Sequence, residues 1–61
     1  MKKLKIGYRI GKYEVASDSF VTSAEAYEAL DKRKWNLIYE IGFKKCVRYC
    51  NGSWYIAAKR M

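Results

Sequence analysis

Eight residues near the two ends of the chain have side chains suited to binding nucleic acid. Lysine and arginine neutralise phosphates, and an exposed tyrosine beside an arginine can stack on an unpaired base. The residues are Lys3, Lys5, Arg9, Lys12, Lys44, Arg48, Tyr55 and Lys59. They occur in segments where apolar and polar residues alternate, so we expect them to share the outer face of a β-sheet. The competing explanation is that cations on outer strands only prevent sheets from adding to one another.

Residue types that support catalysis are scarce in this chain. The sequence has no histidine, no glycine-rich phosphate loop and no carboxylate pair spaced for acid and base roles. Cys46 and Cys50 are too few for a tetrahedral zinc site. On one strand their Cα atoms would be ~13 Å apart, too far for a disulfide. We therefore predict no catalytic residues, no metal and no cofactor, with free thiols as is typical of a cytoplasmic protein.

Length and charge limit the classes of partner. Sixty-one residues predict a single domain, residues 1–61, with marginal stability that a homodimer would support. Thirteen Lys and Arg against six Asp and Glu give a net charge of +7. Such a charge favours nucleic acid first, an acidic protein second and anionic lipid third. No apolar run approaches the ~20 residues of a membrane span, so we expect no membrane partner.

The turn Asn51-Gly52 between two apolar runs predicts a β-hairpin with strands near residues 43–50 and 53–59. Counting outward from a two-residue turn pairs Arg48 with Tyr55 and Val47 with Ile56. Side chains alternate across a strand, so one face should form a core and the other should be cationic. The core face would carry Phe43, Val47, Tyr49, Trp54, Ile56 and Ala58, and the outer face Lys44, Cys46, Arg48, Cys50, Ser53, Tyr55, Ala57 and Lys59.

A second hairpin is predicted near the start of the chain. Alternation from Leu4 to Ile10 indicates a strand near residues 3–9, and the change of phase at Gly11 indicates a turn that leads into a strand near 12–16. The resulting pairs are Tyr8 with Tyr13 and Ile6 with Val15 on the core face, and Arg9 with Lys12 on the outer face. The like charges of the last pair cost stability. This cost indicates either that the turn lies one residue away or that the charge serves a partner.

A capping box, Thr22-Ser23-Ala24-Glu25, predicts a helix that begins at Ser23. Apolar residues at helical spacing continue to Ile41, which favours one helix over about 23–41 with Gly42 as the left-handed residue that ends it. The alternative is a helix that ends near Lys34, followed by a strand from Trp35 to Ile41.

These elements predict an α+β fold of ββαββ order, a four-stranded antiparallel sheet with one helix packed on one face and the other face open to solvent. The core residues would be Leu30, Val47, Trp54 and Ile56, joined by Ile6 and Val15 from the first hairpin.

We expect a small basic nucleic-acid-binding protein that uses the cationic outer face of the sheet. The first alternative is a binding module or inhibitor that docks on an acidic protein, anchored by Trp35 and Tyr39 exposed on the long helix. Those two aromatics have a competing explanation, which is that they cover a sheet edge. The second alternative is a winged DNA reader, which requires the helix to break between Lys32 and Trp35, with Trp35 turned into the core.

Overall fold

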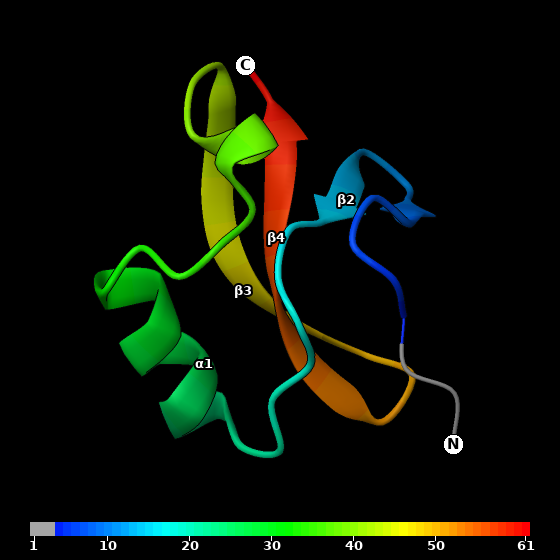
Figure 1. Ribbon diagram of the computed structural model, residues 1–61. Helices are drawn as coiled ribbons and strands as arrows, with labels where there is room; N and C mark the ends of the chain where they lie inside the picture. The colour runs from blue at the N-terminus through cyan, green and yellow to red at the C-terminus, as the bar shows by residue number, and fades with distance from the viewer. Residues whose placement is uncertain (1–3) are drawn as a thin grey trace.

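Within residues 4–61, the part of the chain that the computed structural model describes, four strands form one antiparallel sheet in the order β1-β2-β4-β3 (Figure 1). The elements are β1 (Arg9–Ile10), β2 (Tyr13–Val15), α1 (Ser23–Asp31), the 3₁₀ turn η1 (Leu37–Tyr39), β3 (Phe43–Cys50) and β4 (Ser53–Arg60). The helix α1 contacts β3 and β4. The predicted α+β class and ββαββ order are confirmed.

The β3–β4 hairpin has the predicted register throughout. All eight residue pairs, from Phe43 with Arg60 to Cys50 with Ser53, follow from the two-residue turn. Asn51 and Gly52 have φ of 53° and 81°, the positive values that a type I′ turn requires at both central positions. The turn sequence alone therefore determines the register of the two longest strands.

The turn of the first hairpin lies one residue later in the chain than predicted. Its turn is Gly11-Lys12, so Ile10 pairs with Tyr13 and Arg9 pairs with Glu14. Gly11 has φ 60° and supplies the positive φ that a type II′ turn needs at its first central residue. The predicted like-charge pair of Arg9 and Lys12 does not form, because the shifted turn places the carboxylate of Glu14 opposite Arg9 instead.

The strand expected over residues 3–9 is also wrong within the described residues. β1 contains only Arg9 and Ile10. Two residues, Gly7 and Tyr8, oppose Val15: the Gly7 amide donates to the Val15 carbonyl at 2.7 Å, and the Val15 amide donates to the Tyr8 carbonyl at 2.9 Å. Gly7 has φ 96°, so the chain bulges away from the ladder there. The predicted pairs of Tyr8 with Tyr13 and Ile6 with Val15 do not form.

The helix α1 begins as predicted but ends ten residues earlier than the long-helix interpretation. Thr22 and Glu25 form the complete capping box. At the other end Arg33 has φ 57°, the Arg33 amide donates to Leu30 at 3.1 Å and the Lys34 amide donates to Ala29 at 2.9 Å. These two bonds and the left-handed residue define a Schellman motif. Arg33, rather than Gly42, therefore ends the helix.

The segment that follows α1 is neither helix nor strand for most of its length. Asn36 caps η1 by accepting from the Ile38 amide at 3.0 Å, and η1 is a single 3₁₀ turn. The alternative with a helix that ends near Lys34 was right about the break and wrong about the strand. The break and the partly buried Trp35 also match the winged-reader alternative, but a three-residue turn is too short to serve as its recognition helix.

The main core lies between the sheet and α1 with η1. Its buried members are Ala16, Ala29, Tyr39, Ile56 and Ala58, and Phe20, Leu30, Trp35 and Phe43 pack against them. Of the predicted core residues, Ile56 is fully buried and Leu30, Val47 and Trp54 are partly buried. The prediction that Ile6 joins the core is wrong, because the bulge at Gly7 leaves this side chain exposed. Val15 is buried but pairs with Ala57, so it lies on the face away from this core.

Candidate nucleic-acid interface

The outer face of the sheet is the face that carries alternate residues of β2, β3 and β4, opposite the main core. Directly paired residues on adjacent strands share a face, so the register places the face's members without ambiguity. They are Tyr13, Val15, Lys44, Cys46, Arg48, Cys50, Ser53, Tyr55, Ala57 and Lys59. This face contains three of the predicted cations.

Lys44 and Lys59 are direct partners on β3 and β4, and Tyr13 of β2 pairs with Lys59 from the other side. Both lysines are exposed. Like charges directly opposite each other on a sheet destabilise it, so this pair costs the fold some stability. An anion bound between the two ammonium groups would offset that repulsion.

Arg48 lies on the same face and has a fixed neighbour. Its guanidinium carbon is 4.8 Å from the centre of the Tyr13 ring, which is a cation–π contact. The two side chains border a hollow of about 80 Å³ that Tyr55 and Ala57 also line. The ring holds the guanidinium in place. Because Arg48 remains exposed, a phosphate can still reach that guanidinium.

Tyr55 does not have the predicted exposure. It is only 1% exposed, and its hydroxyl accepts a hydrogen bond from the Leu4 amide at 3.0 Å. β4 is a central strand, and the segment around Leu4 closes over the outer side of Tyr55, so both faces of β4 are covered at this point. Val15 and Ala57 on the same face are buried as well. The expectation that the outer face is open to solvent is therefore wrong over Val15, Tyr55 and Ala57, and the Tyr55 ring is not available to stack on a base.

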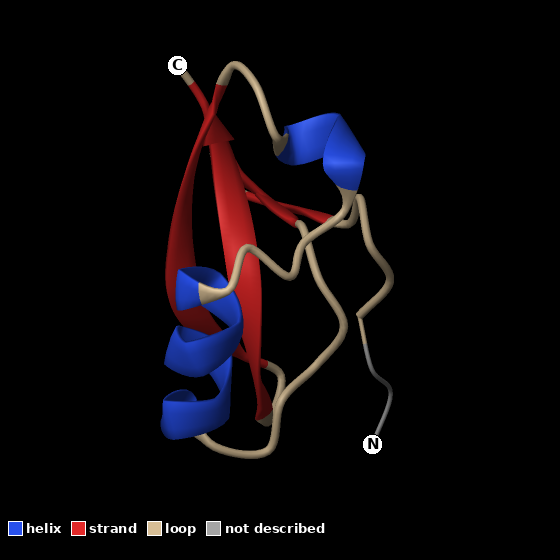
Figure 2. Cartoon of the chain, turned by 60° about the vertical axis from the view of Figure 1, so that its left-hand side comes forward, coloured by secondary structure: helices blue, strands red, loops and turns tan. Residues whose placement is uncertain are grey.

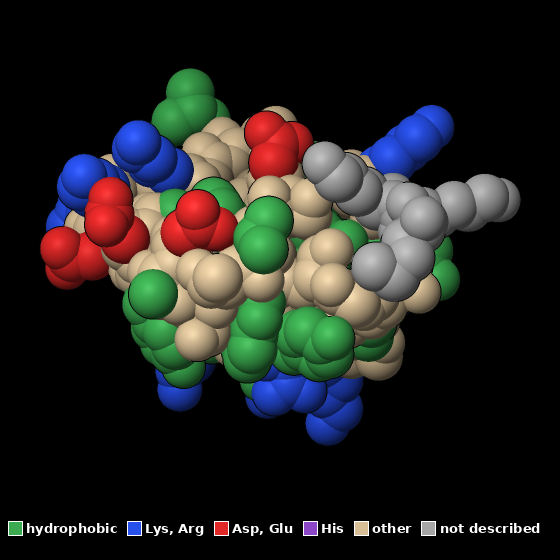
Figure 3. Space-filling view, turned by 90° about the horizontal axis from the view of Figure 1, so that it is seen from below, with side chains coloured by type: hydrophobic (Ala, Val, Ile, Leu, Met, Phe, Trp, Pro, Cys, Tyr) green, Lys and Arg blue, Asp and Glu red, His purple; other side chains and the backbone are tan. Residues whose placement is uncertain are grey.

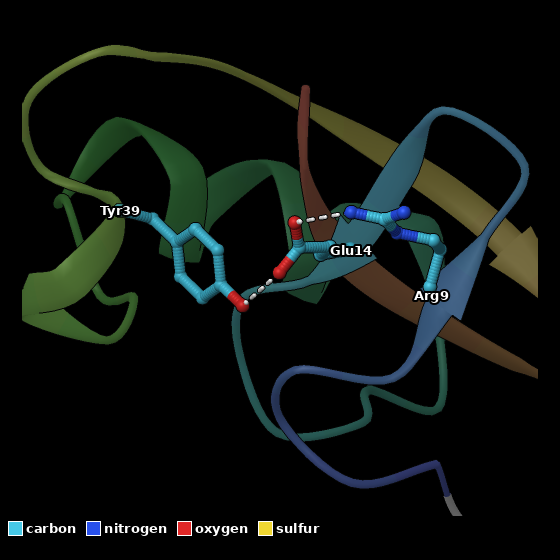
Figure 4. Close-up of polar contacts among 3 residues, drawn as sticks. All are labelled: Arg9, Glu14 and Tyr39. Carbon is cyan, nitrogen blue, oxygen red and sulfur yellow. Dashed lines mark hydrogen bonds and ion pairs between the residues drawn. The ribbon is translucent and has the colours of Figure 1, made fainter. Parts of the chain in front are cut away.

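The predicted cations of the first hairpin are dispersed. Lys3 lies outside the described residues, and Lys5 and Lys12 are exposed, Lys12 in the turn just before Tyr13. Arg9 approaches the carboxylate of Glu14 at 3.7 Å (Figure 4). The structure therefore brings Lys44, Arg48 and Lys59 together on one face. The predicted place of Arg9 on that face is wrong, because its partner Glu14 pairs with Ala58 of the main core, so Arg9 lies on the opposite face.

Tyr39 and Trp35, the anchors of the protein-binding alternative, are not exposed as a pair. Tyr39 is 1% exposed, and its hydroxyl donates to Glu14 at 2.9 Å (Figure 4). Burial raises the pKa of Tyr39, and the hydrogen bond and charge of Glu14 raise it further. Trp35 is partly buried and donates from its indole nitrogen to Glu40 at 2.9 Å. Because the long helix does not form, both rings turn toward the core.

Charge is segregated between the parts of the fold. Residues 43–61 contain five Lys and Arg and no Asp or Glu, whereas residues 18–42 contain five of the six carboxylates. Figure 3 shows Lys and Arg along the lower border of the molecule and also at the upper left and upper right, whereas Asp and Glu lie in the upper half only. The β3–β4 hairpin thus has no carboxylates of its own to neutralise its cations.

Two features of this face were missed by sequence reasoning. Tyr13 was assigned to the core face, and its contact with Arg48 was not foreseen. The signal that could have found it was the unfavourable pairing of Arg9 with Lys12. Moving the turn by one residue removes that repulsion, pairs Arg9 with Glu14, and also turns Tyr13 to the outer face.

When the chain is compared with known proteins, no family model, no curated protein and no solved structure matches it.

Proposed function

We propose that this protein binds nucleic acid through phosphate contacts from the outer face of the β3–β4 hairpin. The observation that carries the proposal is the cluster of Lys44, Lys59 and Arg48 on one face of a hairpin that has no carboxylate. Lysine and arginine on a rigid sheet neutralise phosphates and release counterions from the nucleic acid. Lys12 and Lys5 add charge at the margin of this face. With Tyr55 buried, the binding rests on the backbone of the nucleic acid and not on base stacking.

The test is fluorescence anisotropy with labelled single-stranded and double-stranded DNA and RNA over a range of salt concentrations. If about four cations meet phosphates, the slope of log K against log salt is about −3.6 on duplex and about −2.8 on single strands. The double variant Lys44→Ala with Lys59→Ala should weaken binding and flatten the duplex slope by about 1.8. It should also fold normally, because it removes a like-charge pair.

A matched control separates this face from net charge alone. Arg33→Ala with Lys34→Ala also removes two exposed cations, but from the end of α1. We expect the control to keep most of the affinity and nearly the whole salt slope. Equal losses in the two double variants would show that binding follows net charge and would refute the assignment to the outer face.

A further inference from the structure

The apolar turn, which we define as Leu37, Ile38 and Ile41, exposes three large apolar side chains within five consecutive residues. Their exposed fractions are 82%, 65% and 87%. The long helix expected over about 23–41 would have contained these residues, and that expectation is wrong because the helix ends at Asp31. Contiguous exposed apolar side chains of this kind mark interaction sites.

The apolar turn is held rigidly. Tyr39, between the exposed side chains, is buried in the main core and anchors η1. The Lys45 ammonium donates to the carbonyls of Tyr39, Glu40 and Phe43 at 2.9, 3.1 and 2.9 Å. The same ammonium lies 4.9 Å from the centre of the Trp35 ring. The exposed side chains are therefore presented by a fixed backbone, which lowers the entropy lost when they bind a partner.

Three exposed cations, Lys44, Lys59 and Arg60, lie at this end of the molecule and outnumber the one carboxylate of the turn, Glu40, which accepts from the Trp35 indole. η1 stands at the end of the sheet where β3 begins and β4 finishes (Figure 2). The Arg60 guanidinium lies 5.4 Å from the centre of the Phe43 ring, and the Met61 amide donates to the Gly42 carbonyl at 3.0 Å. Lys44 and Lys59 form the next pair of the hairpin. A second copy of the chain would bring the same cations face to face, so the charges favour an anionic partner.

We propose that the apolar turn inserts into the surface of an anionic lipid bilayer. Leu37, Ile38 and Ile41 would enter the boundary between headgroups and acyl chains, while Lys44, Lys59 and Arg60 contact the anionic headgroups. Side chains this exposed suit a deformable bilayer, which can close around them, better than the rigid surface of a folded protein. No helix in the described residues is long and apolar enough to cross a membrane. This proposal shares Lys44 and Lys59 with nucleic-acid binding, but the apolar turn serves the membrane proposal alone.

The test is co-sedimentation of the full chain with vesicles. Vesicles of phosphatidylcholine with about a quarter phosphatidylglycerol should bind the protein, and vesicles of pure phosphatidylcholine should bind it much more weakly. The variant Leu37→Ser with Ile41→Ser should lower the partition coefficient on anionic vesicles about tenfold or more, because it removes the apolar contribution. Both side chains are exposed, so the variant should keep the circular dichroism spectrum of the native fold.

The control variant is Val21→Ser with Tyr27→Ser, which removes two exposed apolar side chains away from η1. It should partition as the native protein does. In anisotropy with DNA or RNA, Leu37→Ser with Ile41→Ser should bind as the native chain does, which separates the two proposals. The membrane proposal is refuted if the anionic vesicles do not bind the native chain, or if the apolar-turn variant binds them equally well. It is also refuted if the native chain forms a dimer that this variant dissociates.

Discussion

Arg33→Gly should stabilise the fold, although it deletes a charged side chain and adds a glycine. Arg33 has φ 57°, in the left-handed region that costs a residue with a Cβ about 1–2 kcal/mol. Glycine avoids that cost but loses about 0.4–1 kcal/mol through the greater freedom of the unfolded chain. The net gain in the free energy of unfolding is about 0.5–1 kcal/mol. In a domain of this size the melting midpoint should rise by about 2–8 °C.

Urea and thermal unfolding followed by far-ultraviolet circular dichroism measure this effect. Arg33→Ala is the matched control, because alanine removes the charge and keeps the Cβ, so its stability should be close to that of the native chain. The sign of the change in unfolding free energy of Arg33→Gly distinguishes the helix that ends before Arg33 from a helix that continues to residue 41. In a helix over 23–41, glycine at position 33 would lie in the interior and cost about 1 kcal/mol. A destabilisation of that size would refute the Schellman stop at Arg33.

Ser17→Ala should cost about 1–3 kcal/mol of unfolding free energy, since the buried Ile56 amide donates to the Ser17 hydroxyl at 3.0 Å and would lose its acceptor. Urea unfolding measures this cost, and a loss below about 0.5 kcal/mol would contradict the contact. Tyr39→Phe should remove a phenol that ionises above its ordinary pKa of 10.0, which an ultraviolet absorbance titration detects. Because the folded pKa is the raised one, the stability from this hydroxyl is complete below pH 10.0 and declines as the pH rises through the folded value. The difference in unfolding free energy between the native chain and Tyr39→Phe should therefore be constant below pH 10.0 and shrink above it.

Local rules were sufficient wherever a few adjacent residues determine the backbone. Asn51-Gly52 predicted every pair of the β3–β4 hairpin, because a type I′ turn permits only one register. Thr22 and Glu25 predicted the start of α1 through two reciprocal hydrogen bonds. These features depend on chemistry within four residues, which a sequence displays directly.

Local rules failed where a residue adopts a conformation unusual for its type, and where distant parts of the chain decide the outcome. Arg33 in a left-handed conformation has no sequence signal, since glycine is the usual residue there, so the helix seemed to continue to Gly42. Tyr55 pairs with Arg48 and so lies on the predicted outer face. The alternation of residues could not show that the segment beginning at Leu4 closes over the Tyr55 ring. The candidate site therefore kept Lys44, Arg48 and Lys59 of its seven predicted cations and lost its stacking ring.

The position of β4 has a consequence for folding kinetics. β4 is the last strand in the chain, yet it lies between β2 and β3, so β2 has no partner on that side until β4 is in place. The β3–β4 hairpin closes over a two-residue turn and should form within microseconds, whereas pairing Tyr13 with Lys59 closes a loop of most of the chain. We expect the docking of β2 onto β4 to limit the folding rate. Substitutions that weaken the contact of Val15 with Ala57 would then slow folding more than those at the far end of β3, such as Cys50.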